Sequence, residues 1–132
     1  MATQQMAADT ARVSHVTITC GDWQACRTFY EALGLTFAEA EHKGVPLHVS
    51  AQIGGTVLEL VTPGLPGGGP ASSGFRLGLE VPDVQATADA LVAAGGVLLG
   101  APAAGPSGMR AAVIDPDGRR IELIAPRSHE GR

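Results

Sequence analysis

The sequence has little cysteine, few aromatic residues and almost no lysine. Its 132 residues include two cysteines, three Phe, one Trp, one Tyr and a single lysine, Lys43. So few cysteines exclude a small fold held together by disulfides. The arginines are scattered along the chain, and basic residues that do not cluster argue against a nucleic-acid partner.

Long apolar runs are absent as well. No stretch is long and apolar enough to span a bilayer, so we expect no membrane partner. Residues 1–12 contain no apolar signal core, and we therefore expect a cytoplasmic protein. Hydrophobic residues make up 45% of the chain and charged residues 17%, as in a globular domain. The net charge of −4 is weakly compatible with a cationic ligand.

The two cysteines, Cys20 and Cys26, do not form a CxxC pair. Cys20 ends a predicted strand and Cys26 lies inside a predicted helix. We expect two buried thiols rather than a disulfide or a metal site.

What the sequence does contain is an internal repeat. Segment 15–22, HVTITCGD, predicts a strand that meets a helix at Asp22, and segment 76–83, RLGLEVPD, repeats the pattern. Each predicted helix stops at a glycine, and each half closes on an apolar-Glu-Leu strand. Repetition of this kind indicates two copies of one supersecondary unit, which in so short a chain must share one core.

Each half is predicted to form a strand, a helix and three further strands, which gives an α+β fold. We expect one domain over 1–132, with module one at about 12–61, a Gly/Pro-rich linker at 62–74 and module two at 75–126. Residues 101–108 are predicted to be a loop. The predicted strands are 15–20, 45–53, 56–61, 75–81, 96–100, 109–114 and 119–124, and the predicted helices begin at Asp22 and Asp83.

Alternation along the predicted strands separates two faces. In each predicted strand, every second residue is apolar, and these residues are expected to pack against the helices. The residues between them are largely polar and are expected to line a groove on the opposite face of the sheet. The groove set contains the candidate ligand-binding residues His15, Thr17, His48, Ser50, Gln52, Glu59, Arg76 and Glu122. It also contains Val57, Val61, Gly78, Glu80 and Ile124.

Two motifs resemble a known superfamily. The first motif is a strand, an Asp and a helix that ends in Phe29-Tyr30, followed by Leu33-Gly34-Leu35. The second is segment 115–123, DPDGRRIEL. Together they resemble sequences of the vicinal oxygen chelate superfamily, also called the glyoxalase/bleomycin-resistance/dioxygenase family. The resemblance extends over about 13–126. It implies two tandem βαβββ modules with curved mixed sheets that form a ligand groove, and frequently a homodimer.

The resemblance also implies where a metal would bind. Metal enzymes of this family take one ligand from each of four strands, and the matching positions are His15, Glu59, Arg76 and Glu122. Arg76 cannot be a ligand, because a guanidinium stays protonated and has no lone pair to donate. We therefore expect Arg76 to replace the metal and to neutralise the two glutamates, with no cofactor.

The favoured function on this basis is metal-independent binding of a small organic molecule, as in drug-binding members of the family. Sequestration of an antibiotic or another natural product, and hence resistance, is its most concrete form. The sequence names no ligand. It leaves open whether the two modules of one groove come from one chain or from two.

Two enzymatic alternatives stay open, so the sequence does not decide whether the protein is an enzyme. A divalent metal (Zn, Ni, Mn or Fe) on His15, Glu59 and Glu122 would make it a lyase, isomerase or dioxygenase, with Arg76 turned toward an anionic substrate. Catalysis without a metal would use His15 or Glu122 as a general base and Arg76 to stabilise an oxyanion.

Overall fold

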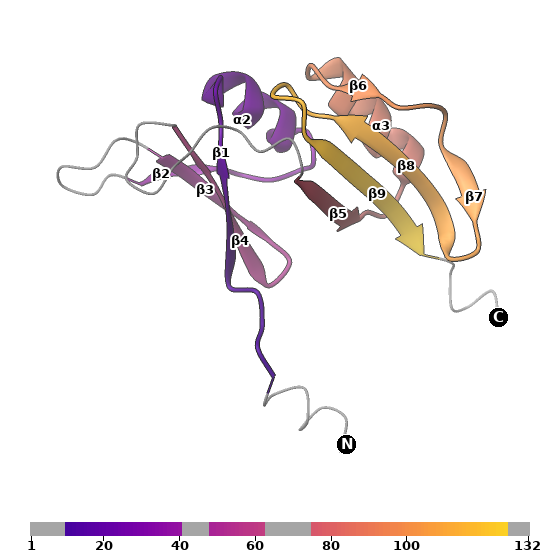
Figure 1. Cartoon of the computed structure of the whole chain (residues 1–132), viewed down its shortest axis with the longest axis horizontal. Coiled ribbons are helices and arrows are strands. Elements are labelled where there is room, and N and C mark those ends of the chain that lie inside the picture. Colours follow the sequence, from indigo (N-terminus) through magenta and orange to yellow (C-terminus); the bar gives the residue numbers. More distant parts are fainter. Residues whose placement is uncertain (1–9, 41–47, 63–74, 127–132) are drawn as a thin grey trace.

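The computed structural model describes residues 10–40, 48–62 and 75–126, and within them two helices and nine strands form two curved mixed sheets (Figure 1). The predicted α+β fold with tandem modules is confirmed. The first sheet contains β1 (His15–Thr19), β2 (Ala38–Ala40), β3 (His48–Ile53) and β4 (Thr56–Val61). The second contains β5 (Arg76–Glu80), β6 (Val97–Leu98), β7 (Ala103–Gly105), β8 (Gly108–Ile114) and β9 (Arg120–Pro126).

The two sheets repeat one topology. The first has the strand order β1-β4-β3-β2 and the second the order β5-β9-β8-β6. In each, the first strand of the module lies parallel to its last strand, and the remaining pairs are antiparallel. A parallel pair needs a crossover connection, which the helix of each module supplies. Most of the predicted linker lies outside the described residues.

The helices are α2 (Trp23–Glu31) and α3 (Val84–Ala93), and both begin where the sequence predicts. Asp22 accepts a hydrogen bond from the N–H of Ala25 at 3.1 Å, and Asp83 accepts one from that of Ala86 at 3.0 Å. Each carboxylate satisfies a backbone donor that the first helical turn leaves without a partner.

The predicted division of faces holds for most strand residues. The helix-facing set is largely buried in one hydrophobic core that contains residues of both modules. Val61 is a correction: it was expected on the open face, yet it is 6% exposed. It ends β4, where its carbonyl accepts a hydrogen bond from the N–H of Cys20 at 2.8 Å, so the turn into α2 closes this end of the sheet.

A second correction concerns the predicted loop 101–108, which contains β7. This strand pairs with β8 through a short reversal in which Gly105 faces Gly108. Ala and Gly have low intrinsic strand propensity, and the segment is a strand because β8 offers a free edge to it.

Helix α2 joins the two modules. Its Phe29 and Tyr30 are fully buried, and the Tyr30 hydroxyl donates a hydrogen bond of 2.6 Å to Asp115, which follows β8. In Figure 1 the helix lies above the region between the two sheets. The core is consequently continuous across both modules rather than divided between them.

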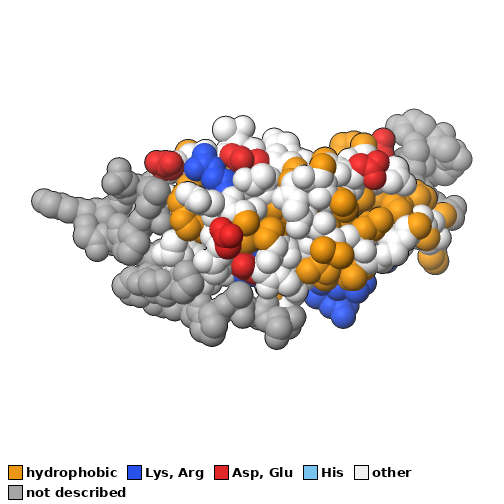
Figure 2. Space-filling model, turned by 90° about the horizontal axis from the view of Figure 1, so that it is seen from above, with side chains coloured by type: hydrophobic (Ala, Val, Ile, Leu, Met, Phe, Trp, Pro, Cys, Tyr) orange, Lys and Arg blue, Asp and Glu red, His pale blue; other side chains and the backbone are white. Residues whose placement is uncertain are grey.

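The surface is mixed in character. Seen from above, hydrophobic side chains gather over the half of the molecule that holds α3 and β6 (Figure 2). Val92, Val97 and Leu99 are among the exposed large hydrophobic residues. Neither helix of the described segments is long and apolar enough to cross a membrane.

Candidate functional site

The predicted site residues lie on the open faces of the two sheets. The structure places His15 and Thr17 on β1, His48, Ser50 and Gln52 on β3, Glu59 on β4, Arg76 on β5 and Glu122 on β9. Six of them therefore belong to the first sheet and two to the second. None is fully buried, so this surface is accessible to a ligand.

On the first sheet, Glu59 is the central charged group. It lies in register with Thr17 on one side and with Ser50 on the other. The Thr17 hydroxyl donates a hydrogen bond of 2.8 Å to its Oε1 atom. These neutral neighbours form a polar row across three strands.

His15 and Gln52 form a second row on the same sheet, on either side of Val57. His15 is exposed, and its Nδ1 atom lies 2.8 Å from the hydroxyl of Ser14. His48 is half-buried in β3 and lies in register with Ala40 of β2. The histidine and glutamine side chains of this face offer hydrogen-bonding groups to a ligand.

On the second sheet, Glu122 is held by two arginines. The Nε atom of Arg120 donates a hydrogen bond of 2.8 Å to its Oε2 atom, and Nη1 of Arg76 lies 3.6 Å from the same oxygen. The hydrogen bond from Arg120, together with the charges of Arg120, Arg76 and Arg110, lowers the pKa of Glu122 below its ordinary value. Glu122 is therefore a carboxylate at neutral pH.

Arg76 neutralises one of the two glutamates that it was expected to bridge. It pairs with Glu122, whereas Glu59 bonds to Thr17, and within the described part of the chain no ion pair joins Arg76 to Glu59.

Sequence reasoning missed Arg120 and Arg110. The strand period that assigns Glu122 and Ile124 to the open face also assigns Arg120 to it, and β8 brings Arg110 alongside Ile124. Together they border a cavity of about 260 Å³, which we call the arginine pocket. Its lining residues are Leu99, Ala101, Arg110, Ala111, Ala112, Arg120 and Glu122.

An apolar cavity of about 330 Å³ lies where the two sheets meet. It is lined by Val13, Val16, Ile53, Thr56, Leu58, Leu77, Gly78 and Leu79. Four of these eight, Val16, Leu58, Leu77 and Leu79, belong to the apolar strand residues that were predicted to pack against the helices. The sequence could not show that the helices leave a space there, because that depends on how the sheets are placed.

The candidate metal ligands His15, Glu59 and Glu122 do not fit a metal ion within one chain. Among the described residues, a single set of three possible ligands has donor atoms all within 4.8 Å of one another, and it consists of Cys20, Cys26 and Asp117. Glu122 is in addition occupied by two guanidinium groups. Both approach the Oε2 atom, and their positive charges oppose a cation at this glutamate.

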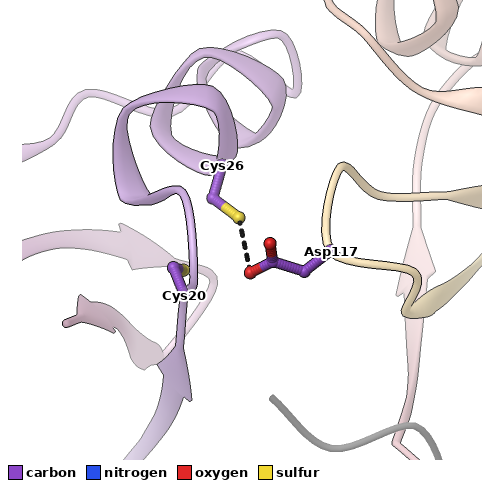
Figure 3. A group of neighbouring side chains, drawn as sticks. All are labelled: Cys20, Cys26 and Asp117. Carbon is purple, nitrogen blue, oxygen red and sulfur yellow. Dashed lines mark hydrogen bonds between the residues drawn. The ribbon is translucent and has the colours of Figure 1, made fainter. Parts of the chain in front are cut away.

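The set of Cys20, Cys26 and Asp117 joins the two modules (Figure 3). Both thiols are buried, as predicted, and the Cys26 thiol donates a hydrogen bond of 3.3 Å to Asp117. The neighbouring Cys20 thiol and burial raise the pKa of Cys26, so its thiol stays protonated.

The charge of Asp117 is already balanced. It accepts a hydrogen bond of 2.9 Å from the N–H of Gly21 and lies 3.4 Å from a guanidinium nitrogen of Arg119. Because a metal would require deprotonated thiols, the set fits a structural junction better than a metal site.

The sequence matches the model of the Glyoxalase/Bleomycin resistance protein/Dioxygenase superfamily over residues 12–123. No curated protein matches it significantly.

Solved structures show the same similarity. A glyoxalase-related enzyme from Fulvimarina pelagi is 28% identical, with a TM-score of 0.66 over 88% of this chain and 88% of that one. TnmS3, an antibiotic binding protein from Streptomyces sp. CB03234, is 27% identical, with a TM-score of 0.70 over 90% of this chain and 98% of that one. A glyoxalase/bleomycin resistance protein from Albidiferax ferrireducens T118, at 24% identity, has a TM-score of 0.69 over 89% of this chain and 100% of that one.

Proposed function

The chain belongs to the glyoxalase/bleomycin resistance protein/dioxygenase superfamily, and from this premise we propose that it binds a small organic molecule without a metal. The molecule is an antibiotic or another natural product, which the protein sequesters. The similarity to the antibiotic binding protein TnmS3 supports this version of the function.

The observation that carries the proposal is the pairing of Glu122 with Arg76 and Arg120. Two guanidinium groups approach the Oε2 atom of Glu122, and their positive charges oppose the binding of a metal cation at this carboxylate. The positive charge that a metal would bring is therefore already supplied by side chains. What is left is a polar face suited to hold an organic ligand by hydrogen bonds and contact area.

A metal-dependent lyase, isomerase or dioxygenase is the second candidate. It is favoured by the similarity to a glyoxalase-related enzyme, and by the presence of one imidazole and two carboxylates, His15, Glu59 and Glu122, on the open faces. A divalent ion held there would polarise an oxygen atom of the substrate. Catalysis without a metal, with His15 or Glu122 as base, would use the same face.

We also propose that the protein is a cytoplasmic homodimer. Among the described residues, Arg76 pairs with Glu122 of its own sheet and Glu59 bonds to Thr17 of the other, whereas a second copy could set one sheet opposite the other. Sedimentation equilibrium tests this point: a mass of one chain at micromolar concentration would contradict it.

The proposed function is tested by metal analysis followed by a ligand screen. Protein purified without chelator should carry far less than one divalent ion per chain, and fluorescence of the lone Trp23 should respond to natural products with or without EDTA. A content close to one ion per chain, with binding lost on chelation, would favour the enzyme instead.

Arg76→His tests the alignment of the site with the metal enzymes. If position 76 corresponds to a lost metal ligand, the substitution should create or tighten zinc binding, measured by calorimetry. Arg27→His, which places a histidine on α2, is the matched control. Equal zinc affinity in both variants would refute the alignment.

A further inference from the structure

We propose that the arginine pocket recognises an oxyanion, a carboxylate or a phosphate, carried by the small organic ligand, and that Arg110 and Arg120 bind it. The inference rests on the proposed function and adds the chemical class of the ligand. Neither arginine is among the positions aligned with metal ligands.

Three adjacent strands bring the positive charges together. Arg76 on β5 and Arg120 on β9 are partners in register, and Glu122 follows two residues later on the same face. Across β9, Glu122 lies opposite Ala112, and Arg110 is two residues from Ala112 on β8. The arginines thus surround the glutamate from three strands.

The open face of the second sheet carries a positive charge around the arginine pocket, whereas the whole protein has a net charge of −4. Three arginines, Arg76, Arg110 and Arg120, accompany Glu122, and one carboxylate balances only one of them. Glu80 lies on the same face, but Ile124 separates it from Arg110 across the strands. Counting both glutamates, one positive charge is still uncompensated.

The guanidinium groups also have unused donors. In the described segments, the Arg120 side chain bonds to Glu122 only through Nε, and Arg110 makes no hydrogen bond or ion pair. Arg119, by contrast, uses its guanidinium on Asp115, Asp117 and the carbonyl of Thr19. Both terminal nitrogens of Arg119 have partners within the fold, whereas the two arginines at the pocket keep the fork of N–H groups that matches an oxyanion.

The remaining lining fits an organic ligand rather than a free ion. Leu99 and Ala101 border the pocket, and the small side chains of Ala111 and Ala112 leave its volume open. At about 260 Å³ the cavity is smaller than most sites for a whole drug-sized molecule. It accommodates one end of such a molecule, an anionic group with a short apolar body.

Glu122 is the one lining group that repels an anion. Its hydrogen bond from Arg120 fixes that guanidinium in the pocket wall, and its charge is compensated by the arginines around it.

The test uses three small probes of similar shape: benzoate, phenylphosphate and uncharged benzamide. Titrations followed by calorimetry and by amide NMR should show binding of at least one anion, with shifts at Ala112 and Glu122, and about tenfold weaker binding of benzamide. Tighter binding of benzoate identifies a carboxylate ligand, and tighter binding of phenylphosphate identifies a phosphate. Affinity should fall as salt is added.

Arg110→Gln is the decisive variant, because in the described segments Arg110 makes no hydrogen bond or ion pair that the substitution would break, and it acts on Glu122 only through its charge. It should weaken anion binding about tenfold and leave the melting temperature unchanged. Arg27→Gln, on α2, is the matched control and should bind the anions like the original protein. Arg120→Gln should weaken binding by a similar factor.

Three results would overturn the inference: equal affinity for benzamide and the anions, no binding of any probe, or unchanged anion binding in Arg110→Gln. Natural products bound without a metal would leave the proposed function standing in each case. If instead chelation abolished the binding of natural products while the anions still bound through Arg110, the proposed function would fail and the oxyanion pocket would stand.

Discussion

Arg119 and Arg120 are neighbours in the sequence and differ completely in their surroundings. Arg119 is 2% exposed and lies between the modules, whereas the side chain of Arg120 is 40% exposed on the open face. The strand period already assigns Arg120 to the open face, but the role of Arg119 could not be predicted, because an arginine pair after a DPDG turn is typical of a solvated hairpin. The burial of Arg119 depends on α2 and β1, which are distant in the chain.

The ion pair of Arg119 with Asp115 should be important for stability. The two groups are 2.8 Å apart and both are buried, so Asp115→Asn removes the nearer counter-ion of a buried guanidinium and leaves it only Asp117, at 3.4 Å. We expect the free energy of unfolding in urea to fall by about 3–5 kcal/mol. The control is Glu31→Gln, which removes an exposed partner of Arg27 and should cost less than about 1 kcal/mol. Equal losses in the two variants would contradict this.

Glu122 gives a prediction on pH. Its pKa lies below the ordinary value of 4.5, chiefly because Arg120 donates a hydrogen bond to it. Since the folded pKa is lowered, the stabilisation from this pairing is present above the ordinary pKa and is lost as the pH falls through the lowered one. NMR titration of the side-chain carboxyl should show a higher midpoint in Arg120→Gln. An unchanged midpoint would mean that Arg120 does not hold Glu122 in solution.

At the scale of secondary structure, most of the fold could be predicted from local signals. Asp22 and Asp83 mark both helix starts, and alternation assigns most strand residues to the correct face. Strand β7 was missed because its pairing comes from β8 and not from its own residues. The candidate site was predictable to the same extent: the strand period gives the strand and face of each residue, and the pairing of Arg76 with Glu122 was expected. The bond of Glu59 to Thr17 depends on a neighbouring strand, and Arg120, on the same strand as Glu122, was overlooked.

Gly96 shows how closely the second module packs against α2. A Cβ atom at this position would lie 2.6 Å from Phe29 and 2.7 Å from Val113, so the neighbouring side chains or the backbone would have to shift. Gly96→Ala should therefore lower the free energy of unfolding by about 1–3 kcal/mol, measured by urea denaturation. Gly78→Ala is the matched control, since a Cβ there meets nothing within 4 Å. A loss as large in the control would indicate a general backbone effect.

At the scale of the whole molecule, the two modules are joined by one hydrophobic core and by contacts of α2, in module one, with the buried pair of Asp115 and Arg119 in module two. We expect them to unfold together. Fluorescence of Trp23, which lies in module one, and hydrogen exchange of β8 and β9 in module two should report the same transition midpoint in urea. Separate midpoints would show that the modules are independent units.

The contact between the Cys26 thiol and Asp117 has a practical consequence. The only two cysteines of the chain are fully buried, and the one whose thiol contacts a carboxylate is kept protonated, so neither reacts readily with maleimides in the folded protein. A cysteine introduced at an exposed groove position such as Gln52 would then be the one thiol open to labelling. The groove can carry a fluorophore or a spin label without any change to the native cysteines.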